Sequence, residues 1–243
     1  MSVSEKNFQV NFKSVIKKQF PQSSINRVAV LPTTEYEGIF RNGGIGTYYK
    51  NLAQKLTLAG WDVILIVGDF ESEYRGESHL PEVKHIFSTN QVKYCLNLTA
   101  NHFLMLEQPD CNWADSISLA VWFYLEAIVR NFLSSKIYVE FHEMLGIGYR
   151  TIQAKKVGLL PQHCIIATTM HSGHEWIYEA NEKHQVEYVE WLWRTANHEQ
   201  FSVEEVDLAF FPSYYLTTRV TDYGWNLDHG INMPNYVPIV TQN

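Results

Sequence analysis

The chain has 243 residues, of which 46% are hydrophobic and 19% are charged, and this composition excludes a disordered protein, which lacks the apolar surface that folding must bury. A formal net charge of −7, with no dense run of Lys and Arg outside a weak patch near the start, excludes a general nucleic-acid binder. Three scattered cysteines, Cys95, Cys111 and Cys164, show no CxxC spacing and fit a reducing compartment better than a disulfide scaffold.

Residues 1–25 differ from the rest of the chain because apolar side chains alternate with lysines until Pro21 breaks the segment. The pattern predicts an N-terminal arm that either packs on the domain or lies as an interfacial helix on an anionic lipid surface. The most apolar stretch, residues 117–133, is short for a membrane span and carries charged residues, and no secretory signal is visible. We therefore expect a cytoplasmic protein, with peripheral contact at the inner membrane face as an option.

From residue 26 onward, β-branched apolar runs alternate with helical patterns. A run such as residues 62–67 has no polar alternation, which is typical of a parallel strand that helices cover on both faces. The expected strands are residues 27–31, 62–67, 136–141, 164–169 and 206–211, and the expected helices are residues 42–59, 91–107, 114–133, 149–157, 175–182, 187–199 and 213–223. This order predicts a doubly wound, mostly parallel α/β sheet of the Rossmann-like type, with residues 26–243 as one domain.

A glycine-rich turn, Gly43-Gly44-Ile45-Gly46, follows the first expected strand and opens the first long helix. Ligands of open α/β sheets bind beyond the carboxyl ends of the strands, and glycines there let an anion reach the free N–H groups of the helix. A diphosphate is the natural guest, although a tight turn that needs positive φ gives the same pattern. A dinucleotide site is a further alternative: Asp69 stands about where a ribose-binding acid would, but Tyr49 occupies the position that GxGxxG keeps for glycine.

Histidines and carboxylates follow two later strands of the expected sheet. His142 and Glu143 come after residues 136–141, and His171, His174 and Glu175 come after residues 164–169. Imidazole titrates near neutrality, so these residues are candidates for a general base or a hydrogen-bonding group. The HxxH spacing of residues 171–174 would suit a metal, but the pair straddles a loop and no HExxH is present. We therefore expect no metal.

Three segments resemble one known family, in the family's order. Residues 42–63 (NGGIGTYYKNLAQKLTLAGWDV) resemble the first glycine-rich helix of GT-B glycosyltransferases, and residues 165–172 (IIATTMHS) are similar to their strand that ends in a functional histidine. Residues 206–215 (VDLAFFPSYY), followed by Tyr223-Gly224, resemble a third segment. The likeness is greatest to the retaining family 4 group and covers about residues 27–237.

The resemblance implies the N-terminal, acceptor-binding half of a two-domain enzyme that moves a sugar from a nucleotide diphosphate sugar to an acceptor with retention of configuration. It implies no metal and no cofactor. The acceptor would be a glycan, a lipid-linked molecule or a small molecule. The implied site residues are Gly43, Gly44, Gly46 and Thr47 for the donor diphosphate, His171 for catalysis, and His142, Glu143, His174 and Glu175 for the acceptor.

The family's second domain supplies most of the nucleotide contacts, including two acids eight positions apart, and the sequence shows no such motif. The expected partner is therefore a missing C-terminal GT-B domain. Two other functions stay open: a non-catalytic binding or regulatory module that kept the fold, and a nicotinamide-dependent oxidoreductase.

An aromatic stretch at residues 190–194 (EWLWR) has two interpretations. Tryptophan stacks on sugar rings, so the stretch could be an acceptor platform. Core packing is the expectation here, because tryptophan is highly buried on average.

Overall fold

The computed structural model describes residues 26–37, 43–69, 83–84, 94–99, 113–181 and 190–236, so the predicted arm of residues 1–25 lies outside the described residues. The strands of the described part are β1 (Arg27–Thr33), β2 (Asp62–Asp69), β3 (Val83–Lys84), β4 (Tyr94–Thr99), β5 (Lys136–His142), β6 (Cys164–Thr169), β7 (Leu208–Phe211) and β8 (Gly230–Asn232). The helices are α2 (Gly44–Leu58), α4 (Trp113–Asn131), the 3-10 helix η1 (Met144–Gly146), α5 (Tyr149–Lys156), α6 (His174–Ala180), α7 (Glu190–Glu204) and α8 (Tyr214–Asp222).

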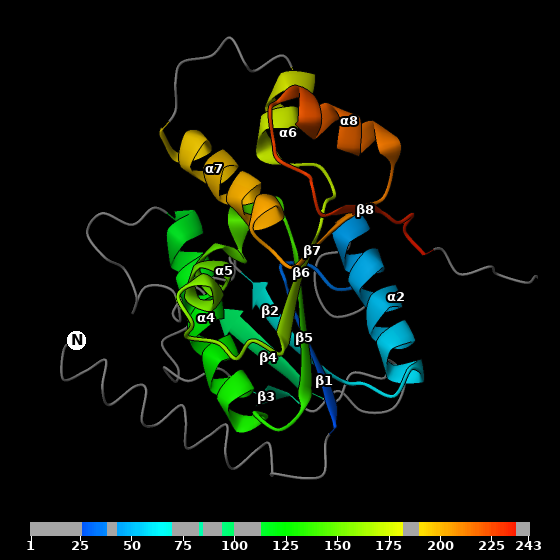
Figure 1. Ribbon diagram of the computed structural model, residues 1–243, viewed down its shortest axis with the longest axis vertical. Coiled ribbons are helices and arrows are strands. Elements are labelled where there is room, and N and C mark those ends of the chain that lie inside the picture. Colours follow the sequence, from blue (N-terminus) through cyan, green and yellow to red (C-terminus); the bar gives the residue numbers. More distant parts are fainter. Residues whose placement is uncertain are drawn as a thin grey trace, which may run out of the picture.

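The strands form one sheet in the order β3-β4-β2-β1-β5-β6-β7-β8. Every neighbouring pair is parallel except β3 and β4, which are antiparallel. Helix α2 covers one face of the sheet, and α4 and α5 cover the other (Figure 1). The predicted doubly wound, mostly parallel α/β sheet is therefore confirmed. None of the helices in the described ranges is long and apolar enough to cross a membrane.

Each face of the sheet has its own apolar core, and β1 contributes to both. Val28 and Val30 pack into the core beneath α4, while Ala29 and Leu31 pack into the core beneath α2. Successive side chains of a strand point to opposite faces, and all four are at most 1% exposed. Burial on both faces is why these strands read as continuous apolar runs in the sequence.

The expected helix at residues 91–107 is wrong in its described part, because Tyr94–Thr99 forms the strand β4. This segment pairs in parallel with β2, with Ile64 opposite Tyr94 and Asp69 opposite Thr99. Pairing with a strand about thirty residues earlier decides the conformation here, and a local helical pattern does not reveal such a partner. The strands β3 and β8, with two and three residues, are too short for a periodic signal.

Strand β1 lies between β2 and β5 in the sheet. The strands β2 to β4 are added on one side of β1 and the strands β5 to β8 on the other, so the strand order reverses at β1. Ligands of open α/β sheets bind at such a topological switch point, beyond the carboxyl ends of the strands. Helices α6, α7 and α8 gather toward that end of the sheet (Figure 1). A ligand site is therefore expected at the residues that follow β1, β5 and β6.

Candidate functional site

The residues that follow β1 contact the end of β5 directly. The backbone N–H of Thr34 donates to Nε2 of His142 at 3.3 Å, and the Thr34 hydroxyl lies 3.3 Å from the same nitrogen. His142 is fully buried, and this burial lowers the pKa of its imidazole to about 3, with a smaller effect from His171. His142 is therefore a neutral group that ties the two strand ends together at the switch point.

The glycine-rich turn holds a carboxylate of the protein itself. Oε2 of Glu35 accepts hydrogen bonds from the backbone N–H groups of Gly43, at 2.9 Å, and Gly46, at 3.3 Å. Gly43 has an ordinary negative φ of −114°, but a Cβ at this position would lie 2.6 Å from Glu35 Oε2. The close approach of an oxyanion to the backbone, and not a positive φ, therefore accounts for this glycine.

Thr47, the next residue of the predicted phosphate set, binds a second acid. Its hydroxyl donates to Oε2 of Glu37 at 3.0 Å, and Lys50 pairs with the other oxygen of that carboxylate. The hydrogen bonds from Lys50 and Thr47 lower the pKa of Glu37. Two carboxylates from the segment after β1 thus accept hydrogen bonds from the polar groups at the start of α2.

His171 lies beside the helix that the glycines open. Its ring meets the ring of Tyr48, on α2, edge to face with centroids 5.0 Å apart. Its Nε2 is buried and has no hydrogen-bond partner among the described residues, and burial lowers the pKa of the imidazole to about 4. His171 is therefore neutral near pH 7, and its Nε2 can still form a hydrogen bond.

Two buried carboxylates hold the His171 loop in place. Glu143, fully buried after β5, accepts hydrogen bonds from the backbone N–H groups of His171, at 2.8 Å, and Ser172, at 2.5 Å. Glu199, on α7 and 1% exposed, accepts from the N–H of His174 at 2.7 Å and from that of Leu145 at 2.9 Å. The turn after β5 and the loop after β6 are thus fastened to each other and to α7.

Burial and hydrogen bonding shift the pKa values of titratable groups in this region. Burial raises the pKa of Glu143 to about 7, although the N–H of Ser172 opposes this. Nδ1 of His174 lies 2.5 Å from Oε1 of Glu199. Burial alone would lower the pKa of His174, but the hydrogen bond and charge of Glu199 outweigh it and raise the pKa. Glu175 is exposed, and its pKa is raised by partial burial and by the charges of Glu179 and Glu199.

Four acids of this region were absent from the predicted site residues. Glu35, Glu37 and Glu199 sit in polar stretches without any distinguishing pattern. Glu140 did carry a signal, since it is an acid inside the apolar strand β5. It is 1% exposed and accepts hydrogen bonds from Tyr48 at 2.6 Å, from Thr169 at 2.7 Å and from Tyr138. Glu140 therefore joins α2 to β5 and β6 beneath His171.

A charged cavity lies elsewhere, at the amino ends of β6 and β7. Lys155, Lys156, Glu205 and Asp207 are among its lining residues, and the lysines pair with Asp207 and Glu205 respectively. It has no contact with the groups at the switch point. Within the described ranges, His, Cys, Asp and Glu side chains form no group of three that could hold a metal ion.

The pKa values of the three site histidines shift in two directions: those of His142 and His171 are lowered and that of His174 is raised. The folded pKa values of His142 and His171 lie below the value of about 6.5 of an unfolded histidine. As the pH falls below about 6.5, the unfolded chain takes up protons first, so the stabilisation from these two groups is complete above that pH and is lost toward pH 4 and below. Imidazole NMR titration should show His142 and His171 neutral at pH 5.5 and His174 charged at a higher pH than usual. A midpoint near 6.5 for His171 would contradict its burial.

The geometry defines a Rossmann-like α/β domain with an anion-binding turn and a neutral imidazole at the switch point. No protein-family model and no curated protein matches the chain. Among solved structures, it resembles sucrose-phosphate synthase from Thermosynechococcus elongatus, with a TM-score of 0.57, 14% identity, and coverage of 86% of this chain and 48% of that one. It also resembles the catalytic domain of starch synthase IV from Arabidopsis thaliana bound to ADP and acarbose, with a TM-score of 0.51, 12% identity, and coverage of 88% and 52%.

These likenesses establish the fold: the chain has the Rossmann-like α/β architecture found in GT-B glycosyltransferases. The chain spans about half the length of the solved structures that it matches.

Proposed function

We propose that the chain is the N-terminal, acceptor-side domain of a retaining glycosyltransferase that uses a nucleotide diphosphate sugar. The observation that carries the proposal is that the N–H groups of Gly43 and Gly46 converge on an oxyanion at the switch point. His171, with its unpartnered Nε2, lies against Tyr48 of the same helix. An anion-binding turn and a neutral base on neighbouring elements are what transfer from a diphosphate leaving group requires.

In this proposal the donor diphosphate replaces the carboxylate of Glu35 at the start of α2. The backbone N–H groups and the helix dipole then stabilise the negative charge that grows on the leaving diphosphate. These donors are fixed before the reaction, so little reorganisation accompanies the transfer. A second domain, as in the two-domain enzymes of this fold, would supply the remaining donor contacts.

His171 would act on the sugar or on the acceptor hydroxyl. Because its pKa is lowered to about 4, the ring is neutral at pH 7 and its free nitrogen can accept a hydrogen bond or a proton. Glu143 and Glu199 fix the loop that carries it, which keeps the imidazole oriented. The exposed Glu175 and the ring of His174 are the candidates for acceptor contact, and Glu143 and His142 would support them from beneath.

Ligand titration of the chain tests the proposal. Inorganic pyrophosphate, UDP, GDP and ADP are added, and thermal unfolding is followed. A ligand at 100 times its Kd adds about 2.7 kcal/mol, or roughly 5–10 °C for a domain of this size. Gly43→Ala should abolish the shift, because its Cβ would lie 2.6 Å from the oxyanion position that Glu35 Oε2 occupies. Gly44→Ala is the matched control, because among the described residues nothing lies within 4 Å of a Cβ at Gly44. A shift with NAD(H) alone would favour the oxidoreductase, and no shift with any ligand would favour the non-catalytic module.

Glu35→Ala is expected to raise the affinity for pyrophosphate. The variant frees the two N–H groups and removes a negative charge, and hydrogen bonds to charged groups are worth about 1.5–3 kcal/mol each. Part of this is offset by new hydration of the turn, so we expect a gain of about three- to tenfold by calorimetry. Glu126→Ala is the matched control, because it removes one carboxylate from α4, where Glu126 pairs with Arg130 and not with the groups at the start of α2. A weaker affinity in Glu35→Ala would show that Glu35 assists the ligand.

A further inference from the structure

Helix α7 presents two tryptophans to solvent. Trp191 is 45% exposed and Trp193 is 57% exposed, so the expectation of core packing is wrong for both residues. Tyrosine and tryptophan side chains with wet faces are enriched at binding surfaces, because they offer a large apolar area with few rotatable bonds. The two exposed indoles are therefore candidates for ligand contact.

Trp191 forms a corner with two rings of α6. Its ring centroid lies 6.3 Å from that of His174, at 88°, and 6.1 Å from that of Tyr178, at 73°. Neither neighbour stacks on the indole. We call Trp191, Tyr178 and His174 the aromatic corner. Its His174 begins α6, directly after the loop that carries His171, and its ring contacts Glu199. The corner thus continues directly from the candidate site.

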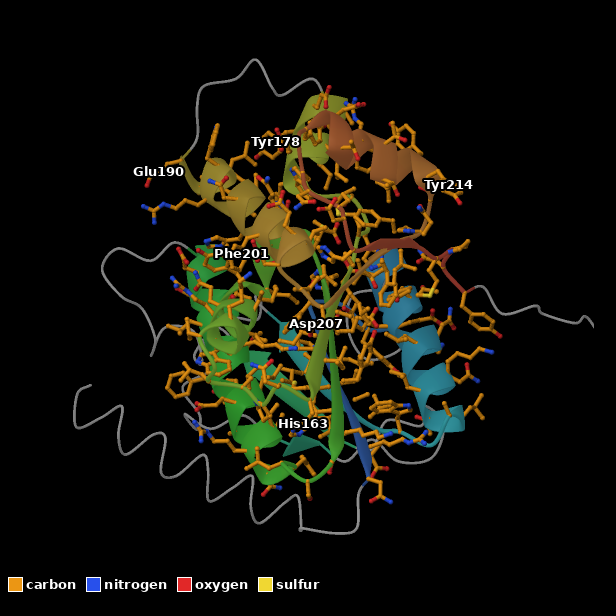
Figure 2. All side chains as sticks on the ribbon, in the orientation of Figure 1. His163, Tyr178, Glu190, Phe201, Asp207 and Tyr214 are labelled. Carbon is orange, nitrogen blue, oxygen red and sulfur yellow. The ribbon has the colours of Figure 1, made fainter. Side chains whose placement is uncertain are left out.

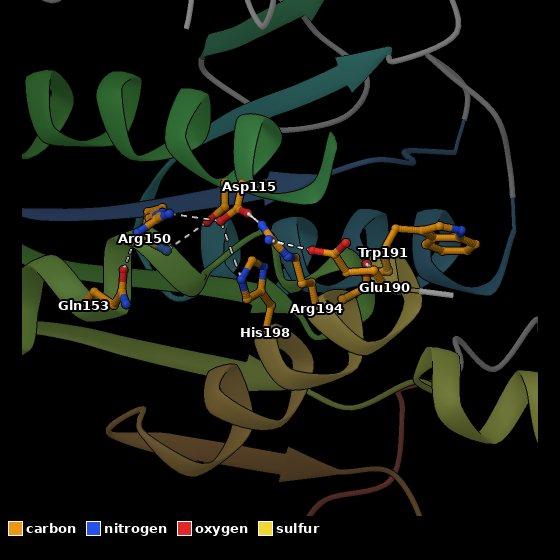
Figure 3. A network of polar contacts seen from close by, with 9 residues as sticks. Asp115, Arg150, Gln153, Glu190, Trp191, Arg194 and His198 are labelled. Atoms are coloured by element: carbon orange, nitrogen blue, oxygen red, sulfur yellow. Dashed lines mark hydrogen bonds and ion pairs between the residues drawn. The ribbon is translucent and has the colours of Figure 1, made fainter. Parts of the chain in front are cut away.

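The helix that carries Trp191 is fastened to the rest of the domain. Asp115 of α4 pairs with Arg150 of α5 at 2.9 Å and contacts two α7 residues, His198 at 3.5 Å and Arg194 at 4.0 Å. Figure 3 shows this network, with Trp191 pointing away from it. A ring on an anchored helix loses little entropy when a ligand stacks on it.

The charges around the aromatic corner disfavour an anionic ligand. Three acids, Glu175, Glu179 and Glu190, lie on α6 and the start of α7. The nearby arginines are engaged with them, since Arg194 pairs with Glu190 and Arg219 pairs with Glu179. Tyr178 and Glu190 lie at the end of the molecule opposite to His163 (Figure 2). A bilayer with anionic lipids would be repelled here, whereas a neutral polyol would find hydrogen-bond acceptors.

We propose that the aromatic corner binds a pyranose ring of the acceptor, so that the acceptor is an oligosaccharide or a glycoside. The apolar C–H face of the ring packs on the indole of Trp191, and its hydroxyl groups form hydrogen bonds with the rings of His174 and Tyr178 that flank the indole. The sugar lies one ring beyond His174, which places the next residue of the acceptor toward His171. This assignment rests on the proposed function, because it names the substrate class of the same site.

Sugar titration of the chain itself tests the assignment. The indole N–H resonances of ¹⁵N-labelled protein are followed while maltose, cellobiose, lactose and mannobiose are added up to about 50 mM. We expect a saturable shift of the Trp191 resonance with at least one disaccharide and at least a tenfold weaker affinity in Trp191→Ala. Trp191→Phe keeps an aromatic face and should recover part of the affinity. Trp193→Ala is the control, because residues two positions apart on a helix do not share a face.

Three outcomes would overturn the assignment: no saturable shift with any of the four sugars, an equal loss of affinity in Trp193→Ala, or a response only to vesicles that contain anionic lipid. The titration with pyrophosphate and UDP separates this result from the proposed function. If the chain binds nucleotide but not sugar, only the assignment of the aromatic corner is wrong. If it binds sugar but not nucleotide, the proposed glycosyltransferase function is wrong and the chain is a sugar-binding module.

Discussion

His171→Ala should reduce sugar transfer by about 10²–10⁴-fold when the chain acts together with the second domain of a GT-B enzyme, if the imidazole transfers a proton. The variant removes the unpartnered Nε2 beside Tyr48 and leaves the backbone N–H that Glu143 binds. Donor affinity should change little, because the turn at Gly43 and Gly46 is untouched. The measurement is kcat and KM for transfer, together with the pyrophosphate affinity of each variant.

The pH dependence of transfer separates a chemical role from a packing role. His171 has a lowered folded pKa of about 4, so the active neutral form persists as the pH falls from 8 to 5.5 and is lost only near pH 4. His171→Gln keeps a neutral hydrogen-bonding group that cannot carry a proton, so it should stay as slow as His171→Ala if the imidazole transfers a proton. Partial recovery in His171→Gln would assign the imidazole a hydrogen-bonding role. The exposed His163, at the opposite end of the molecule, supplies the control variant His163→Ala. Unchanged turnover in a folded His171→Ala protein would make this residue a packing group.

Sequence patterns predicted the parts of the fold that depend on burial. The strands β1, β2, β5 and β6 carry apolar residues on both faces, and each was predicted to within two residues at either end. The same strands predicted which candidate residues would lie near one another, because polar residues at the carboxyl ends of parallel strands gather at one edge of the sheet. Strand β4 was predicted as a helix, since its conformation depends on pairing with β2, which is remote in the sequence.

The supporting acids could not be predicted because their partners are backbone groups of distant loops. Glu35 binds N–H groups eight and eleven residues later, and Glu199 binds one that is 54 residues earlier. Any acid in a polar stretch looks alike until the chain is folded. The exposure of Trp191 and Trp193 has a similar origin, since the outward face of α7 depends on how the Asp115 network orients that helix.

The largest loss of stability is expected from Glu199→Ala. The wild-type carboxylate is 1% exposed and accepts from the N–H groups of Leu145 and His174 and from the ring of His174. Its removal leaves two buried N–H donors and an imidazole without an acceptor, which costs about 3–5 kcal/mol by analogy with a broken buried pair. Leu145 adds to this, because its φ of 65° is a left-handed conformation that the hydrogen bond helps to hold.

Urea unfolding of matched variants measures this effect. Glu205→Ala, just beyond the end of α7, removes a partly exposed carboxylate paired with Lys156 and should cost less than about 1 kcal/mol. Glu199→Gln keeps an oxygen for one of the donors and should fall between the two. The pKa of His174 should drop in both Glu199 variants, because the hydrogen bond and charge that raise it are lost. If Glu199→Ala unfolds at the same urea concentration as Glu205→Ala and His174 titrates as in the wild type, then Glu199 does not hold the His171 loop, and the orientation of the imidazole must come from Glu143 alone.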